Sequence, residues 1–215
     1  MNSFLKNNLY FLLPYLVFVV SGAILILISS QAGLHLYFNT FHADVADTFF
    51  DYLTFLGDGQ TVIVSALILL FVRFRYTLII LLSSGLSTLI TQSIKHFVNA
   101  DRPVRFFEAI NIKLYLVPGV HNNIHWSFPS GHSTAAFTLY FCLALFSANK
   151  WMKFVFFLLA LSVSYSRVYL SQHFFEDIYA GALIGVLCVI LIYSLLINVK
   201  PNGALDRSLG TTKFR

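Results

Sequence analysis

The sequence EDIYAGALIGVLCVILIYSLLIN, residues 176–198, decides the fold class, because only its first two residues carry charge. A helix crosses the hydrocarbon core of a bilayer with about 20 mostly apolar residues, so this run predicts a membrane-spanning helix. Five more apolar runs precede it, at roughly 9–30, 60–74, 76–97, 130–148 and 152–170. The sequence therefore predicts an all-α, polytopic integral membrane protein with six transmembrane helices.

The composition agrees with a membrane protein. Of the 215 residues, 58% are hydrophobic and 11% are charged, whereas soluble domains are about 45–50% apolar and about 25% charged. The net charge of +5 is scattered between apolar runs, which indicates membrane orientation and not a nucleic-acid partner. Cys142 and Cys188 lie within apolar runs and are interpreted as small buried residues. Six spans use most of the chain, so residues 1–215 are expected to form a single membrane domain.

The basic residues predict an orientation. With six spans both chain ends lie on one side, and nine basic residues share that side: Lys6, Arg73, Arg75, Lys150, Lys153, Lys200, Arg207, Lys213 and Arg215. The opposite side carries five: Lys95, Arg102, Arg105, Lys113 and Arg167. Because cytoplasmic connections carry the excess of Lys and Arg, both termini are expected in the cytoplasm.

Two longer segments then face the outer side, residues 31–58 and 99–129. The first carries Asp44, Asp47 and Asp51 at helical spacing, with apolar residues between them. This pattern predicts an amphipathic helix on the membrane surface, with the acids on its solvated face.

Residues 99–129 form the longest polar connection. His121 and His125 are four apart and are candidate metal ligands only if this connection is helical; otherwise they are surface histidines. Arg105 and Glu108 are candidates for guiding a substrate towards the site.

Three polar clusters fall at the outer ends of expected helices. The first is KHFVNADRP, residues 95–103, in which Lys95 ends an apolar run and Arg102 follows before a turn at Pro103. Taken alone, Lys95 is typical of a lysine whose ammonium reaches from a helix end to the membrane surface. The second is PSGH, residues 129–132, at the start of an apolar run. Free backbone N–H groups at a helix start bind anions, and a glycine there lets a ligand approach closely.

The third cluster is Ser166-Arg167, followed by His173 and Asp177. His173 and Asp177 are four residues apart, so on a helix they share one face. A carboxylate in that position can hold one ring nitrogen and fix the tautomer, which leaves the other nitrogen free to attack.

Together the clusters resemble the type 2 phosphatidic acid phosphatase family, over a core from Lys95 to Asp177. The resemblance implies that family's haloperoxidase-like helical core and a mechanism without metal or cofactor. It also implies catalytic roles: His173 as nucleophile, Asp177 orienting His173, and His132 as general acid. The residues implied to hold the phosphoryl oxygens are Lys95, Arg102, Ser130, Gly131 and Arg167.

The expected function is a lipid phosphatase of a bacterial inner membrane, with its active site facing the periplasm. Candidate substrates are phosphatidylglycerophosphate, phosphatidate, undecaprenyl diphosphate and a lipid A phosphate. Partners are limited to this lipid phosphate and membrane lipids, and the oligomeric state stays open. An alternative is a phosphoryl or headgroup transferase that uses the same site. A transporter without chemistry is disfavoured, because intramembrane polar residues that mark a transport path would lie nearer mid-membrane.

Overall fold

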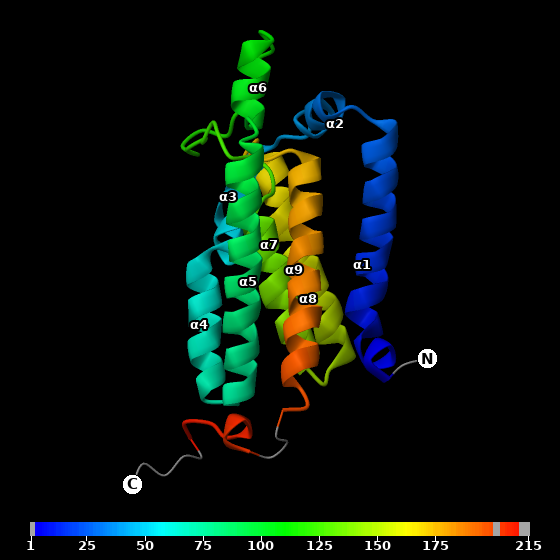
Figure 1. Ribbon diagram of the computed structural model, residues 1–215. Helices are drawn as coiled ribbons and strands as arrows, with labels where there is room; N and C mark the ends of the chain where they lie inside the picture. Colours follow the sequence, from blue (N-terminus) through cyan, green and yellow to red (C-terminus); the bar gives the residue numbers. More distant parts are fainter. Residues whose placement is uncertain (1–2, 200–202, 211–215) are drawn as a thin grey trace.

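The computed structural model is a bundle of α-helices, and it describes residues 3–199 and 203–210 (Figure 1). Within those residues the chain contains no β-strand. The helices are α1 (Ser3–Ile28), α2 (Gln31–Phe38), α3 (Asp44–Leu53), α4 (Gly59–Leu70), α5 (Phe74–Val98), α6 (Pro103–Ala109), α7 (Gly131–Phe146), α8 (Lys150–Tyr169) and α9 (Phe175–Leu196), with 3-10 turns η1 (Thr54–Gly57) and η2 (Ala204–Asp206). The all-α prediction is confirmed.

Each of the six predicted apolar segments corresponds to a helix, namely α1, α4, α5, α7, α8 or α9. Within the described part of the chain, four helical stretches are long and apolar enough to cross a membrane. A fifth qualifies only if α3, η1 and α4 count as one span, bent by 54°. The structure thus supports a multi-pass membrane protein with four or five candidate spans, and the prediction of six is not confirmed.

Helix α7 is shorter than a usual span, and protein surrounds it. Its 16 residues extend about 24 Å at 1.5 Å each, against a hydrocarbon core of about 30 Å. Phe137 and Phe141 are fully buried. Phe141 stacks on Phe11 of α1, and Phe137 meets Phe157 of α8 edge to face. This central helix carries the second polar cluster at its start.

Two glycines bring α9 against α7. A Cβ added at Gly181 would lie 2.7 Å from the Ser130 carbonyl oxygen, and one at Gly185 would lie 2.7 Å from the Thr134 carbonyl oxygen. A side chain at either position would therefore push the helices apart. Small residues four apart are a common device for close approach of membrane helices. Here the approach lets the Ser130 backbone N–H donate to the Asp177 carbonyl oxygen at 3.0 Å.

The two ends of the bundle differ. In Figure 1, α1 begins and α9 ends at one end of the bundle, whereas α2 and α6 lie at the other. Arg75 fastens η2 to the first end: its guanidinium donates to Asp206 and to the Leu196 and Val199 carbonyl oxygens. The start of α1 and the η2 turn thus lie at the same end of the bundle. Three of the basic residues counted for orientation, Lys200, Lys213 and Arg215, lie outside the described residues.

The segment 31–58 differs from its prediction. It forms two helices and a 3-10 turn, not one surface helix. The solvated face predicted for its acids is wrong for Asp47, whose carboxylate is buried and accepts from the hydroxyls of Tyr169 (2.5 Å) and Tyr115 (2.8 Å). Val45 and Phe49 are exposed on α3, so the apolar side of this helix is open to the surroundings.

The segment 99–129 contains the short helix α6, and its remaining residues form no helix. His121 and His125 therefore do not meet the helical condition for a shared metal site. His125 instead lies 3.3 Å from the Asp101 carboxylate, and Arg105 lies 3.3 Å from the same oxygen. Within the described ranges, no group of three or more His, Cys, Asp or Glu side chains is placed to hold a metal ion.

Candidate active site

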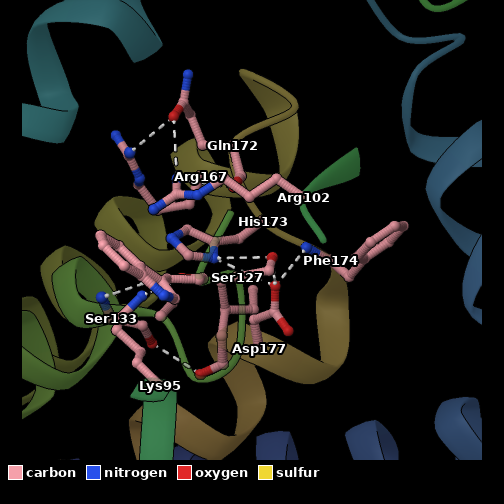
Figure 2. A network of polar contacts seen from close by, with 12 residues as sticks. Lys95, Arg102, Ser127, Ser133, Arg167, Gln172, His173, Phe174 and Asp177 are labelled. Carbon is pink, nitrogen blue, oxygen red and sulfur yellow. Dashed lines mark hydrogen bonds and ion pairs between the residues drawn. The ribbon is translucent and has the colours of Figure 1, made fainter. Parts of the chain in front are cut away.

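The three polar clusters meet where α5 and α8 end and where α7 and α9 begin (Figure 2). Arg102 Nη1, from the first cluster, donates to the Gln172 carbonyl oxygen at 3.1 Å, next to His173. The second cluster joins the third through the Ser130–Asp177 backbone bond described above. Lys95 Nζ donates at 2.5 Å to the carbonyl oxygen of Trp126, which precedes the second cluster by a few residues. Residues far apart in sequence thus form one site.

A tight turn between α8 and α9 places His173. The backbone N–H groups of Gln172 and His173 both donate to the Arg167 carbonyl oxygen, at 2.9 and 3.0 Å. Ser171 adopts a left-handed conformation with φ of 53°, which folds the chain back over the end of α8. The backbone of His173 is therefore bonded to that of Arg167, and the residue is 1% exposed.

Asp177 lies against the His173 ring. His173 Nδ1 lies 3.2 Å from Asp177 Oδ2, and the same oxygen accepts from Ser127 Oγ (2.5 Å) and from the Phe174 N–H (3.0 Å). An ionised carboxylate only accepts hydrogen bonds, so the ring proton resides on Nδ1. His173 Nε2 then carries the lone pair and is the nitrogen that can attack.

The charge state of His173 suits a nucleophile. Burial, together with the neighbouring cations Arg102, Arg167 and Lys95, lowers the pKa of His173 well below its ordinary value. A histidine with a lowered pKa stays neutral throughout the neutral pH range, and only a neutral ring has a lone pair to donate.

The same three cations are buried. Lys95, Arg102 and Arg167 are each 8–9% exposed. Arg167 Nη1 donates to Thr54 Oγ1 at 2.5 Å, but its Nε is buried without a hydrogen-bond partner in the described parts of the chain. A phosphoryl oxygen would satisfy such a donor. Ser130, the N-cap residue of α7, is fully buried, and its hydroxyl accepts from the Ser133 N–H, while Gly131 begins the helix.

Gln172 was not identified from the sequence, although it connects the two arginines. Its Oε1 accepts from Arg102 Nη1 at 3.3 Å and from Arg167 Nη2 at 3.4 Å. Its amide nitrogen donates to the His121 carbonyl oxygen at 2.9 Å and to Asn122 Oδ1 at 2.5 Å. The Gln172 amide therefore fixes the spacing between the two guanidinium groups. In Figure 2, Arg102, Arg167 and Gln172 lie on the same side of His173.

Two further residues of the site lie outside the predicted set. Ser127 holds Asp177, as described, and Asp58 contacts His132: Asp58 Oδ1 lies 2.7 Å from His132 Nε2. No spacing rule connects Asp58 to the three clusters, because the contact arises only when α4 packs near α7.

Comparisons with known proteins agree with this geometry. Over 126 residues the chain is 36% identical to an undecaprenyl-diphosphatase of Sulfolobus acidocaldarius. The aligned region covers 57% of this chain and 56% of the relative. Over 124 residues it is 32% identical to phosphatidylglycerophosphatase B of Bacillus subtilis, covering 54% and 55% of the two chains. The chain thus spans about half the length of the curated relatives it matches.

Two solved structures share the fold. The crystal structure of Aquifex aeolicus LpxE superposes with a TM-score of 0.67 at 30% identity, covering 75% of this chain and 93% of that one. A transmembrane PAP2-type phosphatidylglycerolphosphate phosphatase from Bacillus subtilis superposes with a TM-score of 0.66 at 24% identity, covering 88% and 96%. The family model of the PAP2 superfamily matches residues 76–200, which contain all three polar clusters. This chain belongs to the PAP2 superfamily.

Proposed function

We propose that this protein is an integral-membrane lipid phosphatase that hydrolyses a phosphomonoester or diphosphate of a lipid through a phosphohistidine on His173. The observation that carries the proposal is the setting of His173. Its ring is neutral and fixed by Asp177, and it lies beside the buried cations Lys95, Arg102 and Arg167. Phosphoryl transfer depends mainly on positioning and on stabilising charge on the phosphoryl oxygens, and this arrangement provides both.

The reaction has two steps. In the first, the lone pair of His173 Nε2 forms a bond to phosphorus as the bond from phosphorus to the lipid oxygen breaks, and His132 gives its proton to that oxygen. In the second, water attacks the phosphohistidine, His132 takes a proton from the water, and inorganic phosphate leaves. His173 is restored, and Asp177 offsets the positive charge on its ring while the phosphoenzyme exists.

The relatives support a lipid phosphate as substrate, since they are named as an undecaprenyl-diphosphatase and a phosphatidylglycerophosphatase. We include phosphatidylglycerophosphate, phosphatidate, undecaprenyl diphosphate and a lipid A phosphate as candidates. Each of these lipids presents a terminal phosphate at a membrane surface. The candidate site lies at one end of the helix bundle, where such a phosphate could reach it. We further propose that residues 1–215 form one membrane domain of a bacterial inner membrane.

The first prediction tests this function. Purified protein in detergent should release inorganic phosphate from at least one of those four lipids, and an excess of EDTA should leave the rate within about twofold. The reason is electrostatic: two guanidinium groups and an ammonium supply the positive charge that metal ions supply in other phosphatases. Phosphate release that EDTA abolishes and Mg²⁺ restores would contradict the mechanism, and label recovered on an acceptor lipid in place of free phosphate would indicate a transferase.

The second prediction concerns orientation, with the site facing the periplasm and both chain ends in the cytoplasm. Asn123 lies in the outer connection and Ala148 between α7 and α8, and both are exposed. In intact cells a membrane-impermeant maleimide should label Asn123→Cys but should label Ala148→Cys only after permeabilisation. The native Cys142 and Cys188 are buried, so background labelling should be low. The reverse pattern would place the site in the cytoplasm.

A further inference from the structure

Asp58 lies at the junction between η1 and α4, at the N-cap position of α4. An aspartate there usually accepts from backbone N–H groups of the first turn of its own helix. The Asp58 side chain makes no such capping bond. It reaches across to α7 instead, where Oδ1 lies 2.7 Å from His132 Nε2. The carboxylate is therefore committed to the histidine that we assign as the general acid.

Close packing fixes this approach. A Cβ added at Gly57 would lie 2.6 Å from Val163 Cγ1 and 3.2 Å from the His132 carbonyl oxygen, so the chain before Asp58 is pressed against α7 and α8. At the other end of η1, Thr54 Oγ1 accepts from Arg167 Nη1. One turn of helix thus contacts a phosphate-binding arginine at its start and the candidate acid just beyond its end.

Asp58 and His132 also line a pocket of about 240 Å³ between α4, α5 and α7. Thr88, Thr91 and Gln92 of α5 contribute polar side chains to its wall. This pocket has room for a few carbon atoms with hydroxyl groups, and the candidate acid lies on its surface. The general acid must contact the departing oxygen in order to protonate it. Because His132 lines this pocket, the atoms next to that oxygen would lie in or beside the pocket.

We propose that Asp58 is a positioning residue for proton donation by His132, and that the adjoining pocket receives the polar group next to the departing oxygen of the lipid. This inference rests on the proposed function. Asp58 holds His132 Nε2, so Nδ1 is the nitrogen left to face the leaving oxygen. When the phosphorus–oxygen bond breaks, the Nδ1 proton passes to that oxygen, which becomes the alcohol. His132 becomes neutral, and Asp58 stays ionised and keeps its hydrogen bond to Nε2.

The charges around His132 show why the acid needs this partner. Burial disfavours a proton on its ring, and Arg167 from α8, Arg102 from the connection before α6 and Lys95 from α5 repel one, so the pKa of His132 lies well below its ordinary value. His173 also faces it from the turn before α9, close to Asp177. Asp58, from the junction of η1 and α4, is the carboxylate in direct contact with the ring, and it favours the protonated form by attraction.

The third prediction tests the inference with Asp58→Asn, which keeps the size of the side chain and removes its charge. Loss of an opposite charge at this distance should shift the alkaline limb of the pH–rate profile to lower pH by about one unit or more. On that limb the rate on a phosphomonoester lipid should fall by about tenfold, with a much smaller change on p-nitrophenyl phosphate, whose leaving group needs little protonation. Asp44→Asn, on exposed α3, is the matched control and should match the wild type.

A second readout does not depend on activity. The NMR signals of isotope-labelled histidines are followed against pH in detergent, and the His132 signal is assigned as the one that His132→Gln removes. In Asp58→Asn the titration of that signal should move to lower pH. An unchanged titration would overturn the inference, and so would equal losses on the two substrates with an unmoved pH profile. Failure of the proposed function would appear differently, as absent phosphate release by the wild type with the NMR shift still measurable. Gel filtration of each variant checks that it is folded.

Discussion

Replacing His173 by alanine should lower phosphate release by at least about 10⁴-fold on every substrate, the scale of loss seen when a catalytic nucleophile is removed. The reason is that both steps pass through the bond between phosphorus and His173 Nε2. The measurement uses a lipid with a radiolabelled phosphate and an alkaline quench, because phosphohistidine is stable in base. Wild-type protein should carry label after a brief reaction, and the His173→Ala protein should carry none.

Asp177→Asn is the matched control for this experiment. The amide keeps one oxygen to accept from Ser127 and from the Phe174 N–H, so the turn before α9 should hold. What it loses is the negative charge that stabilises the phosphorylated ring. We expect a loss of about 10- to 10³-fold, equivalent to one to three pK units of carboxylate–imidazolium attraction, with phosphoenzyme still detectable. Equal residual activity in the two variants would mean that His173 is not the nucleophile.

The helices of this protein could be predicted from hydropathy, because lipid and protein interior both favour apolar side chains. The same fact limits the prediction. Helix α7 is as apolar as a spanning helix, but its apolar residues are buried against α1, α8 and α9, and it has only 16 residues. Hydropathy cannot separate a helix surrounded by protein from one that faces lipid. The number of spans therefore did not follow from the apolar runs.

The segment before α4 shows a second limit. Asp44, Asp47 and Asp51 follow a regular spacing that predicts one polar face. Asp47 departs from it because Tyr115 and Tyr169 converge on its carboxylate from distant parts of the chain. Burial of an acid depends on donors supplied by tertiary packing, and the spacing of the acids carries no information about them.

The residues of the candidate site also fall into two groups, those that the sequence indicated and those that only the packing brought to the site. Lys95, Arg102, His132, His173 and Asp177 could be proposed from the sequence because the spacing within the three clusters resembles a family signature. The residues that support them could not. Ser127, Gln172 and Asp58 are common types in ordinary surroundings, and each contacts the site only through the packing of separate helices or connections. For such residues a folded structure is the necessary evidence.

The His132→Ala variant should separate proton donation from phosphate binding, because it should harm substrates unequally. A lipid alkoxide is a poor leaving group, so on a phosphomonoester lipid the loss should be about 10²–10⁴-fold, the usual range for general acid catalysis. p-Nitrophenolate leaves readily without a proton, and a diphosphate lipid departs as a phosphate, so losses there should be much smaller. His121→Ala, in the exposed outer connection, is the matched control and should leave both rates near the wild type.

The pH dependence supplies an independent test of the same assignment. The rate requires neutral His173 and protonated His132. Burial and nearby cations lower the pKa of His173, so its ring becomes protonated, and inactive, only at pH values below the ordinary range for histidine. The acidic limb should therefore lie at low pH. Burial and the same cations also lower the pKa of His132, so the alkaline limb, where this acid has lost its proton, should lie below the ordinary range for histidine. In His132→Ala the residual rate should keep the acidic limb and lose the alkaline one. If both limbs persist, and if the alkyl and aryl phosphates suffer equally, then His132 binds phosphate or supports the fold, and another group protonates the leaving oxygen.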